Sequence, residues 1–152
     1  MSEIPVLVSA CLLGRECRYD GSQNRDRALE RELAEQGLRA VPFCPEEHGG
    51  LGTPRSPAAI EREGAEAVLD RRDRVVTDAG VDVTAQFVKG AQGALAACRA
   101  HGIRLAFLKE RSPSCGVCST HVGASVANGP GVTAALLARH GVEVHGVEGR
   151  RT

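Results

Sequence analysis

The chain has 152 residues, and its 19 basic side chains balance 19 acidic ones. This neutral balance argues against binding to nucleic acid or to a membrane surface through bulk charge. Three Phe, one Tyr and no Trp also leave few rings on which the bases of a single strand could stack. The length and the hydrophobic content of 42% predict that residues 1–152 form a single domain with its own core.

Six cysteines occur in a sequence that shows no export signal. The first residues, MSEIPVLVSACLLG, are apolar but include an acidic side chain and no basic one, which predicts a first strand and not a signal peptide. No apolar run reaches the roughly 18 residues that a membrane-spanning helix needs. We therefore expect a cytoplasmic protein whose reduced thiols serve as metal ligands, catalytic groups or core packing.

Apolar runs of strand length alternate with segments of helical periodicity along the chain. Residues 4–9 predict the first strand, and residues 25–36 have the mixed spacing of a surface helix. A second strand is expected at 38–43, and three Gly and two Pro in 44–55 exclude a helix or inner strand for most of that segment. The other expected elements are a helix with an irregular excursion within 60–73, an edge strand at 75–76, a helix at 83–101, a strand at 103–108, a helix at 131–140 and a strand at 142–147.

This alternation of strands and helices predicts an α/β domain of three layers, with a mostly parallel sheet between helices on both faces. Ligands of such sheets bind beyond the carboxyl ends of the strands, where the strand order switches. Cys11, Cys44 and Cys115 each lie shortly after a predicted strand. We therefore expect these three cysteines at the same rim of the sheet.

Three thiols drawn from three loops suit a soft metal ion or an iron–sulfur cluster. The alternative is that buried cysteines fill space as small apolar side chains. That alternative is favoured for Cys98, which lies on the apolar face of a predicted helix, and it stays open for Cys17. Cys115 and Cys118 also form a CxxC pair, which could be a redox dithiol or half of a zinc site.

Polar side chains accompany the cysteines in the same loops. Glu46 follows Cys44 by two residues, and a carboxyl group beside a metal is a candidate general acid or base. Without the surrounding motif, Glu46 is more simply an exposed loop acid. Ser112 could bind a substrate or satisfy the loop backbone, and solvated loop positions are the simpler interpretation for His48 and His121.

Taken together, five stretches of the sequence resemble the thiouracil desulfidase (TudS) family over nearly the whole chain. They are SACLLGRECRYDG (9–21), CPEEHGGLGTPR (44–55), GVDVTAQFVKGA (80–91), LKERSPSCG (108–116) and GVTAALLARHGVEV (131–144). The resemblance implies a Rossmann-like α/β domain that carries a [4Fe-4S] cluster on three cysteines. It also implies that the fourth iron is open to the sulfur of a thiolated nucleobase.

The reaction implied by the resemblance is non-redox: 2-thiouracil and water give uracil and hydrogen sulfide. Matched residue by residue, the implied metal ligands are Cys11 of SACLLG, Cys44 of CPE and Cys115 of SPSCG. Glu46 of CPE and Ser112 of SPSCG match the positions that assist catalysis, and Ser22, directly after CRYDG, is expected to bind the substrate. The expected partner is thus a small thiolated nucleobase, and the oligomeric state stays open.

The sequence departs from the family pattern after SPSCG. The family has a Tyr-Asp-Gly stretch there that leads to a Phe, whereas this chain reads VCSTHVGASVANGPG over 117–131. Cys118 in that stretch and Cys17 in CRYDG are rivals for a place at the metal. Two other functions remain open on the residues alone: a metal-free redox protein that uses the Cys115/Cys118 pair, and a metal-binding module without enzymatic activity.

Overall fold

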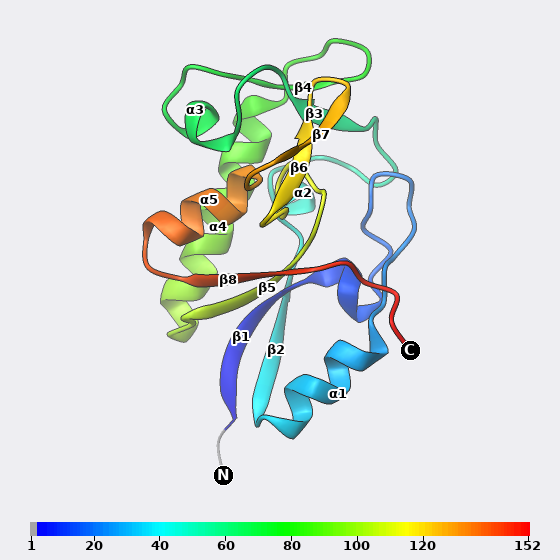
Figure 1. The fold of residues 1–152 in the computed structure, drawn as a ribbon, viewed down its shortest axis with the longest axis vertical. Helices are drawn as coiled ribbons and strands as arrows, with labels where there is room; N and C mark the ends of the chain where they lie inside the picture. Colours follow the sequence, from blue (N-terminus) through cyan, green and yellow to red (C-terminus); the bar gives the residue numbers. More distant parts are fainter. Residues whose placement is uncertain (1–2) are drawn as a thin grey trace.

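The main sheet of the fold has four parallel strands (Figure 1). The structure, a computed structural model, describes residues 3–152. The strand order is β2-β1-β5-β8, which confirms the α/β class and the parallel sheet. All four strands lie within two residues of the predicted runs: β1 (Ile4–Ser9), β2 (Leu38–Phe43), β5 (Leu105–Lys109) and β8 (Glu143–Val147). The inner strands β1 and β5 are mainly apolar because both faces of the sheet are covered, whereas the edge strands β2 and β8 carry exposed residues such as Arg39 and Glu143.

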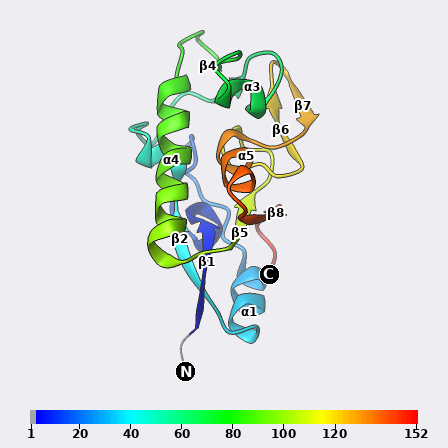
Figure 2. The ribbon, with the colours of Figure 1, turned by 90° about the vertical axis from the view of Figure 1, so that its left-hand side faces the viewer.

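Helices cover the two faces of this sheet. Side chains alternate between the faces of a strand, so Leu7 of β1 packs on one side whereas Val6 and Val8 pack on the other. The Leu7 side carries α4 (Thr84–His101) and α5 (Val132–Arg139), and the opposite side carries α1 (Arg27–Glu35). Figure 2 shows α4 along one side of the molecule. The three predicted layers are therefore present.

A second four-stranded sheet was not predicted. It has the order β4-β3-β6-β7 and consists of β3 (Ala58–Ile60), β4 (Val75–Thr77), β6 (Ser119–Val122) and β7 (Ser125–Asn128). Of these strands the sequence indicated only the edge strand at 75–76. The others have three or four residues each, too few for an alternation of side chains to stand out. A short helix, α3 (Ala65–Leu69), accounts for the helix expected within 60–73.

The carboxyl ends of the central strands continue directly into short turns. β1 leads into a single 3₁₀ turn, η1 (Ala10–Leu13), and β2 leads into α2 (Pro45–His48). The glycine- and proline-rich segment 44–55 thus begins with a short helix, because Pro45 stands at the first helical position, where proline is tolerated.

Helix α2 is held against α4 by close backbone contact. A Cβ atom at Gly90 would lie 2.1 Å from the carbonyl oxygen of Pro45, and one at Gly49 would lie 2.0 Å from that of Gln86. Glycine at both positions lets the two helices approach, and this approach fixes the position of Cys44 and Glu46. Within residues 3–152, no helix combines the length and the apolar character that crossing a membrane requires.

Candidate metal centre

A cavity of about 740 Å³ opens at the carboxyl ends of β1, β2 and β5. Cys11, Cys44 and Cys115 all line it, so the structure brings the three predicted ligands to one rim of the sheet. Its opposite wall comes from the second sheet and includes Ile60 of β3 and Thr77 of β4. The cavity therefore lies between a wall that bears thiols and a wall from a separate sheet.

Cys11 lies in the turn η1 and is buried. Burial raises the pKa of its thiol, whereas a hydrogen bond from Asn24 and the charge of Lys109 act in the opposite direction. The side-chain nitrogen of Asn24 lies 3.8 Å from the Cys11 sulfur, and the Asn24 backbone N–H donates to the Cys11 carbonyl at 2.9 Å. Asn24 thus fixes Cys11 through both its backbone and its side chain.

Cys44 follows β2 directly and forms a pair with Cys17, which also lines the cavity. A hydrogen bond from the Cys17 thiol lowers the pKa of Cys44 to about 7. The same hydrogen bond, together with burial, raises the pKa of Cys17. Cys44 is therefore the member of the pair that ionises first, and its thiolate is the form that binds metals.

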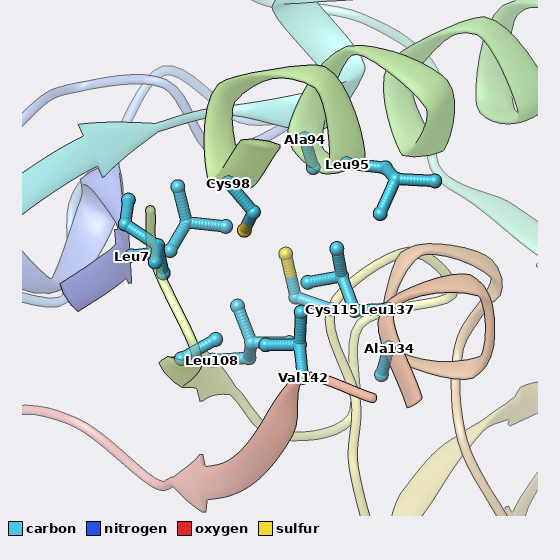
Figure 3. Packing of buried hydrophobic residues seen from close by; sticks show 11 residues of the cluster. Leu7, Ala94, Leu95, Cys98, Leu108, Cys115, Ala134, Leu137 and Val142 are labelled. Atoms are coloured by element: carbon cyan, nitrogen blue, oxygen red, sulfur yellow. The ribbon is translucent and has the colours of Figure 1, made fainter. Parts of the chain in front are cut away.

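Cys115 lines the cavity and also belongs to the apolar cluster beneath the sheet. Figure 3 shows its sulfur directed toward Cys98 of α4, which confirms that Cys98 packs in the core. Burial raises the pKa of the Cys115 thiol. The Ser112 hydroxyl accepts the backbone N–H groups of Ser114 at 3.1 Å and Cys115 at 3.0 Å, so it shapes the turn that carries this cysteine.

Glu46 lines the same cavity and is held by a partly buried arginine. Arg55 donates to its Oε2 from Nε at 2.9 Å and from Nη2 at 2.5 Å, and the two side chains are 10% and 15% exposed. Nη2 of Arg55 also donates to the Cys17 carbonyl at 3.0 Å. The other oxygen, Oε1, faces the Ser112 hydroxyl at 3.5 Å. Glu46 is thus a fixed carboxyl group of the cavity wall and not a solvated loop acid.

Cys118 is exposed and is not among the residues from 3–152 that line the cavity. Its backbone N–H donates to both carboxylate oxygens of Glu110, at 3.1 and 3.2 Å, and those of Val117 and Ser119 donate to the same carboxylate. Glu110 therefore organises the turn after Cys115. Because Cys115 is buried and lines the cavity whereas Cys118 is exposed and lies outside the lining, the geometry does not favour a redox pair.

The remaining candidates divide between the cavity and its surroundings. His121 of β6 lines the cavity, whereas the exposed His48 packs its ring against Phe43. Ser22 is not part of the lining formed by the described residues, since its hydroxyl bonds Asp20 at 2.5 Å and accepts from Arg18 at 3.2 Å. Arg18 itself lines the cavity, so Ser22 contacts a residue of the wall.

Sequence reasoning missed the residues that hold this site together: Asn24, Arg55 and Glu110. Arg55 closes the CPEEHGGLGTPR stretch, and an arginine nine residues after a candidate carboxylate was the one available signal. Asn24 and Glu110 gave none, because a loop amide and a loop acid are common without any role.

The sequence is similar to known proteins over nearly its whole length. The profile of the 2-thiouracil desulfurase family matches residues 6–148. YbbK, an uncharacterized protein of Bacillus subtilis (strain 168), is 41% identical over 143 residues, which cover 91% of this chain and 93% of the relative. The solved structure of the [4Fe-4S]-dependent thiouracil desulfidase TudS matches with a TM-score of 0.79 and 45% identity, over 96% of this chain and 91% of that one.

Proposed function

Because the chain belongs to the 2-thiouracil desulfurase family, we propose that it removes sulfur from a thiolated nucleobase such as 2-thiouracil. The reaction is hydrolytic and involves no net redox change: the C=S group and water give C=O and hydrogen sulfide. The observation that carries the proposal is that Cys11, Cys44 and Cys115 share one cavity with Glu46 and Ser112.

The donor set of this cavity fits a [4Fe-4S] cluster. Cys11, Cys44 and Cys115 come from three strand ends, and every cysteine of the described chain is free of disulfides. Thiolates are the usual ligands of such clusters, and the acidity of Cys44 favours its ligand form. A cluster held by these three cysteines would supply a Lewis-acidic iron for the sulfur of the substrate.

In this proposal Glu46 handles the protons of the reaction. Its Oε2 accepts hydrogen bonds from Arg55, so Oε1 is the atom that accepts a proton from the attacking water and returns it to the leaving sulfur. Ser112 stands 3.5 Å from that atom and is fixed by two backbone donors, so its hydroxyl orients the water or the base. Arg55 is a positioning residue, because it sets the direction of the Glu46 carboxylate.

The wall opposite the thiols is proposed to select the base. It includes His121, Gly123 and Ala124 of the β6–β7 hairpin. We assign Ser22 to substrate binding through Arg18, whose guanidinium reaches the Ser22 hydroxyl from the cavity wall. A hairpin of different sequence gives the cavity a different outline, so the preferred thiolated base can differ among relatives.

The test is an anaerobic assay of reconstituted protein in which iron, acid-labile sulfide and turnover of 2-thiouracil are measured on one sample. We expect uracil and hydrogen sulfide in equal amounts. Ala at Cys11, Cys44 or Cys115 should abolish cluster absorbance. Glu46→Gln should keep the cluster and lower the rate by about 10²- to 10⁴-fold, the range for a lost general acid or base.

Cys118→Ser is the matched control, since this cysteine is exposed and lies outside the cavity. It should keep both the cluster and the rate. An intact cluster that releases no sulfide from any of a panel of thiolated bases would contradict the proposed reaction. Loss of the cluster in Cys118→Ser would contradict the proposed ligand set.

A further inference from the structure

A second group of metal-ligating atoms lies beside the proposed cluster ligands. The sulfurs of Cys17 and Cys44 and a carboxylate oxygen of Glu47 all lie within 4.8 Å of one another. Cys17 and Glu47 have no part in the proposed reaction. Cys17 belongs to the loop after η1, whereas Cys44 and Glu47 lie three residues apart at α2, so two segments of the chain converge here.

The separations within this group are close to those of a small tetrahedral site. Zinc binds thiolate sulfur at about 2.3 Å and carboxylate oxygen at about 2.1 Å, so two sulfurs on one zinc lie about 3.8 Å apart and a sulfur and an oxygen about 3.6 Å apart. The three atoms need to approach by at most roughly 1.2 Å to reach these separations. Side-chain rotation is enough for such a change.

Glu47 supplies the observation that points to a cation. Its Oε2 accepts the Thr53 hydroxyl at 2.8 Å, whereas its Oε1 is buried and accepts no hydrogen bond from the described chain. Nη2 of Arg15 lies 2.9 Å from Oε1 in an ion-pair contact, but this arginine is 63% exposed. The buried Oε1 thus already has a cation beside it, supplied by an exposed side chain, and the Glu47 side chain as a whole is 26% exposed. Arg15 is free to turn into solvent when a metal takes its place.

We propose that the cluster-free protein binds a single zinc ion through Cys17, Cys44 and Glu47, with a water molecule as the fourth ligand. Catalytic and exchangeable zinc sites have this composition of three protein ligands and one water. Cys44 belongs to both ligand sets, so zinc and the cluster exclude each other. That exclusion rests on the proposed function, whereas the zinc site itself does not.

Cobalt(II) is the probe, because it enters tetrahedral zinc sites and absorbs light. Reduced, cluster-free protein should bind one cobalt per chain and show thiolate-to-cobalt charge transfer together with the intense visible bands of a tetrahedral ion. Zinc should displace the cobalt. Cys17→Ser should halve the charge-transfer absorbance per bound cobalt and weaken binding at least about tenfold. Glu47→Gln should weaken binding by a similar factor and leave the charge-transfer absorbance in place.

The matched controls are Cys115→Ser, which removes a proposed cluster ligand, and Cys118→Ser, which removes an exposed thiol. Both should bind cobalt as the parent protein does. Cobalt binding that survives Cys17→Ser but is lost in Cys115→Ser would overturn the proposal, since the metal would then lie on the cluster cysteines. The absence of tetrahedral bands from folded protein, as judged by circular dichroism, would overturn it as well.

The exclusion is measured separately by iron uptake. Wild-type protein loaded with zinc should resist cluster reconstitution, whereas Cys17→Ser treated with the same zinc should take up iron normally. Equal iron uptake by zinc-loaded and zinc-free wild-type protein would contradict the exclusion. If Cys17→Ser cannot hold a cluster without zinc, the proposed ligand set is wrong, and the cobalt spectra still decide the zinc site.

Discussion

Replacing Glu110 by Gln should destabilise the turn that carries Cys115. Glu110 is 7% exposed, and its Oε1 accepts the backbone N–H groups of Val117 at 2.9 Å, Cys118 at 3.1 Å and Ser119 at 3.2 Å. Burial alone would raise the pKa of this carboxyl group, but the backbone hydrogen bonds outweigh it and hold the pKa below its ordinary value of 4.5. The carboxylate is therefore ionised in the folded protein at neutral pH.

The size of this destabilisation follows from the number of N–H groups that donate to the Glu110 carboxylate. Three hydrogen bonds to a charged acceptor contribute about 2 kcal/mol each, whereas the Gln carbonyl can keep at most two neutral ones of about 1 kcal/mol each. The difference of about 4 kcal/mol is reduced because a neutral amide costs less to bury than a carboxylate. We expect Glu110→Gln to lower the free energy of unfolding by about 2 kcal/mol, which corresponds to a fall in Tm of about 4–8 °C for a chain of this size.

The assay is thermal and urea unfolding of cluster-free protein at several pH values. A group whose pKa is lowered on folding contributes stability above its unfolded pKa and loses it as the pH falls through the folded value. The difference between wild type and Glu110→Gln should thus be constant at neutral pH and shrink below about pH 4.5. Glu148→Gln, at a carboxylate that is 58% exposed and paired with Arg111, is the control and should change Tm little.

Gly146→Ala tests the same contact from the opposite strand. A Cβ atom at this position of β8 would lie 1.7 Å from Oε2 of Glu110, so the carboxylate would have to leave its donors. This variant should lose about as much stability as Glu110→Gln, and the double variant should lose little more, because both remove one arrangement. Wild-type stability in either single variant, or a difference that does not depend on pH, would refute the reasoning.

Three further substitutions test the framework around the cavity. Arg55→Met leaves the Glu46 carboxylate, which is 15% exposed, without its cation, so the free energy of unfolding in urea should fall by about 3 kcal/mol. Arg55→Lys should have a stability between those of Arg55→Met and the wild type. An unchanged urea midpoint for Arg55→Met would contradict a stabilising ion pair. Gly90→Ala would put a Cβ atom 2.1 Å from the Pro45 carbonyl oxygen, so helix α2 should shift and the stability measured by calorimetry should fall by about 1–3 kcal/mol. Gln92→Ala, at an exposed position of the same helix α4, is the control and should leave the stability almost unchanged. Asp26→Ala removes the fully buried acceptor of the Leu29 N–H at the start of α1 and should lower the free energy of unfolding by about 1–2 kcal/mol. Asp26→Asn can still accept this N–H and should lose less stability. Equal losses in the two variants would contradict the capping role.

The inner strands of the parallel sheet could be predicted because β1 and β5 are mainly apolar runs, and the edge strands β2 and β8 because each follows a predicted helix that a glycine ends. The rule that parallel strands end at one rim then brought Cys11, Cys44 and Cys115 together without knowledge of the strand order. The second sheet could not be predicted in this way. Its strands β3 and β6 pair across about 60 residues of sequence through a single residue pair, Ile60 with Val122, and such pairing depends on tertiary contacts.

The residues that support the site could not be predicted from the sequence for a related reason. Glu46 is distinguished from an exposed loop acid only by Arg55, and Arg55 reaches it because a turn folds residues 49–55 back over α2. Cys17 could not be assigned because its role depends on the distance between its sulfur and that of Cys44. These are facts of three-dimensional packing that no spacing along the chain encodes.

The cavity lies between two sheets, so the segments that bear the thiols are separate from the segments that form the opposite wall. The reactive wall is encoded by the ends of β1, β2 and β5, whereas the facing wall comes from segments 57–61, 76–78 and 121–124. Changes in the facing wall need not disturb a thiol, and changes near the thiols need not alter the shape of the entrance. A protein built this way can acquire new substrates by drift in one set of segments while its chemistry is conserved in the other. Under the proposed function, transplanting the β6–β7 hairpin between relatives should exchange their substrate preferences.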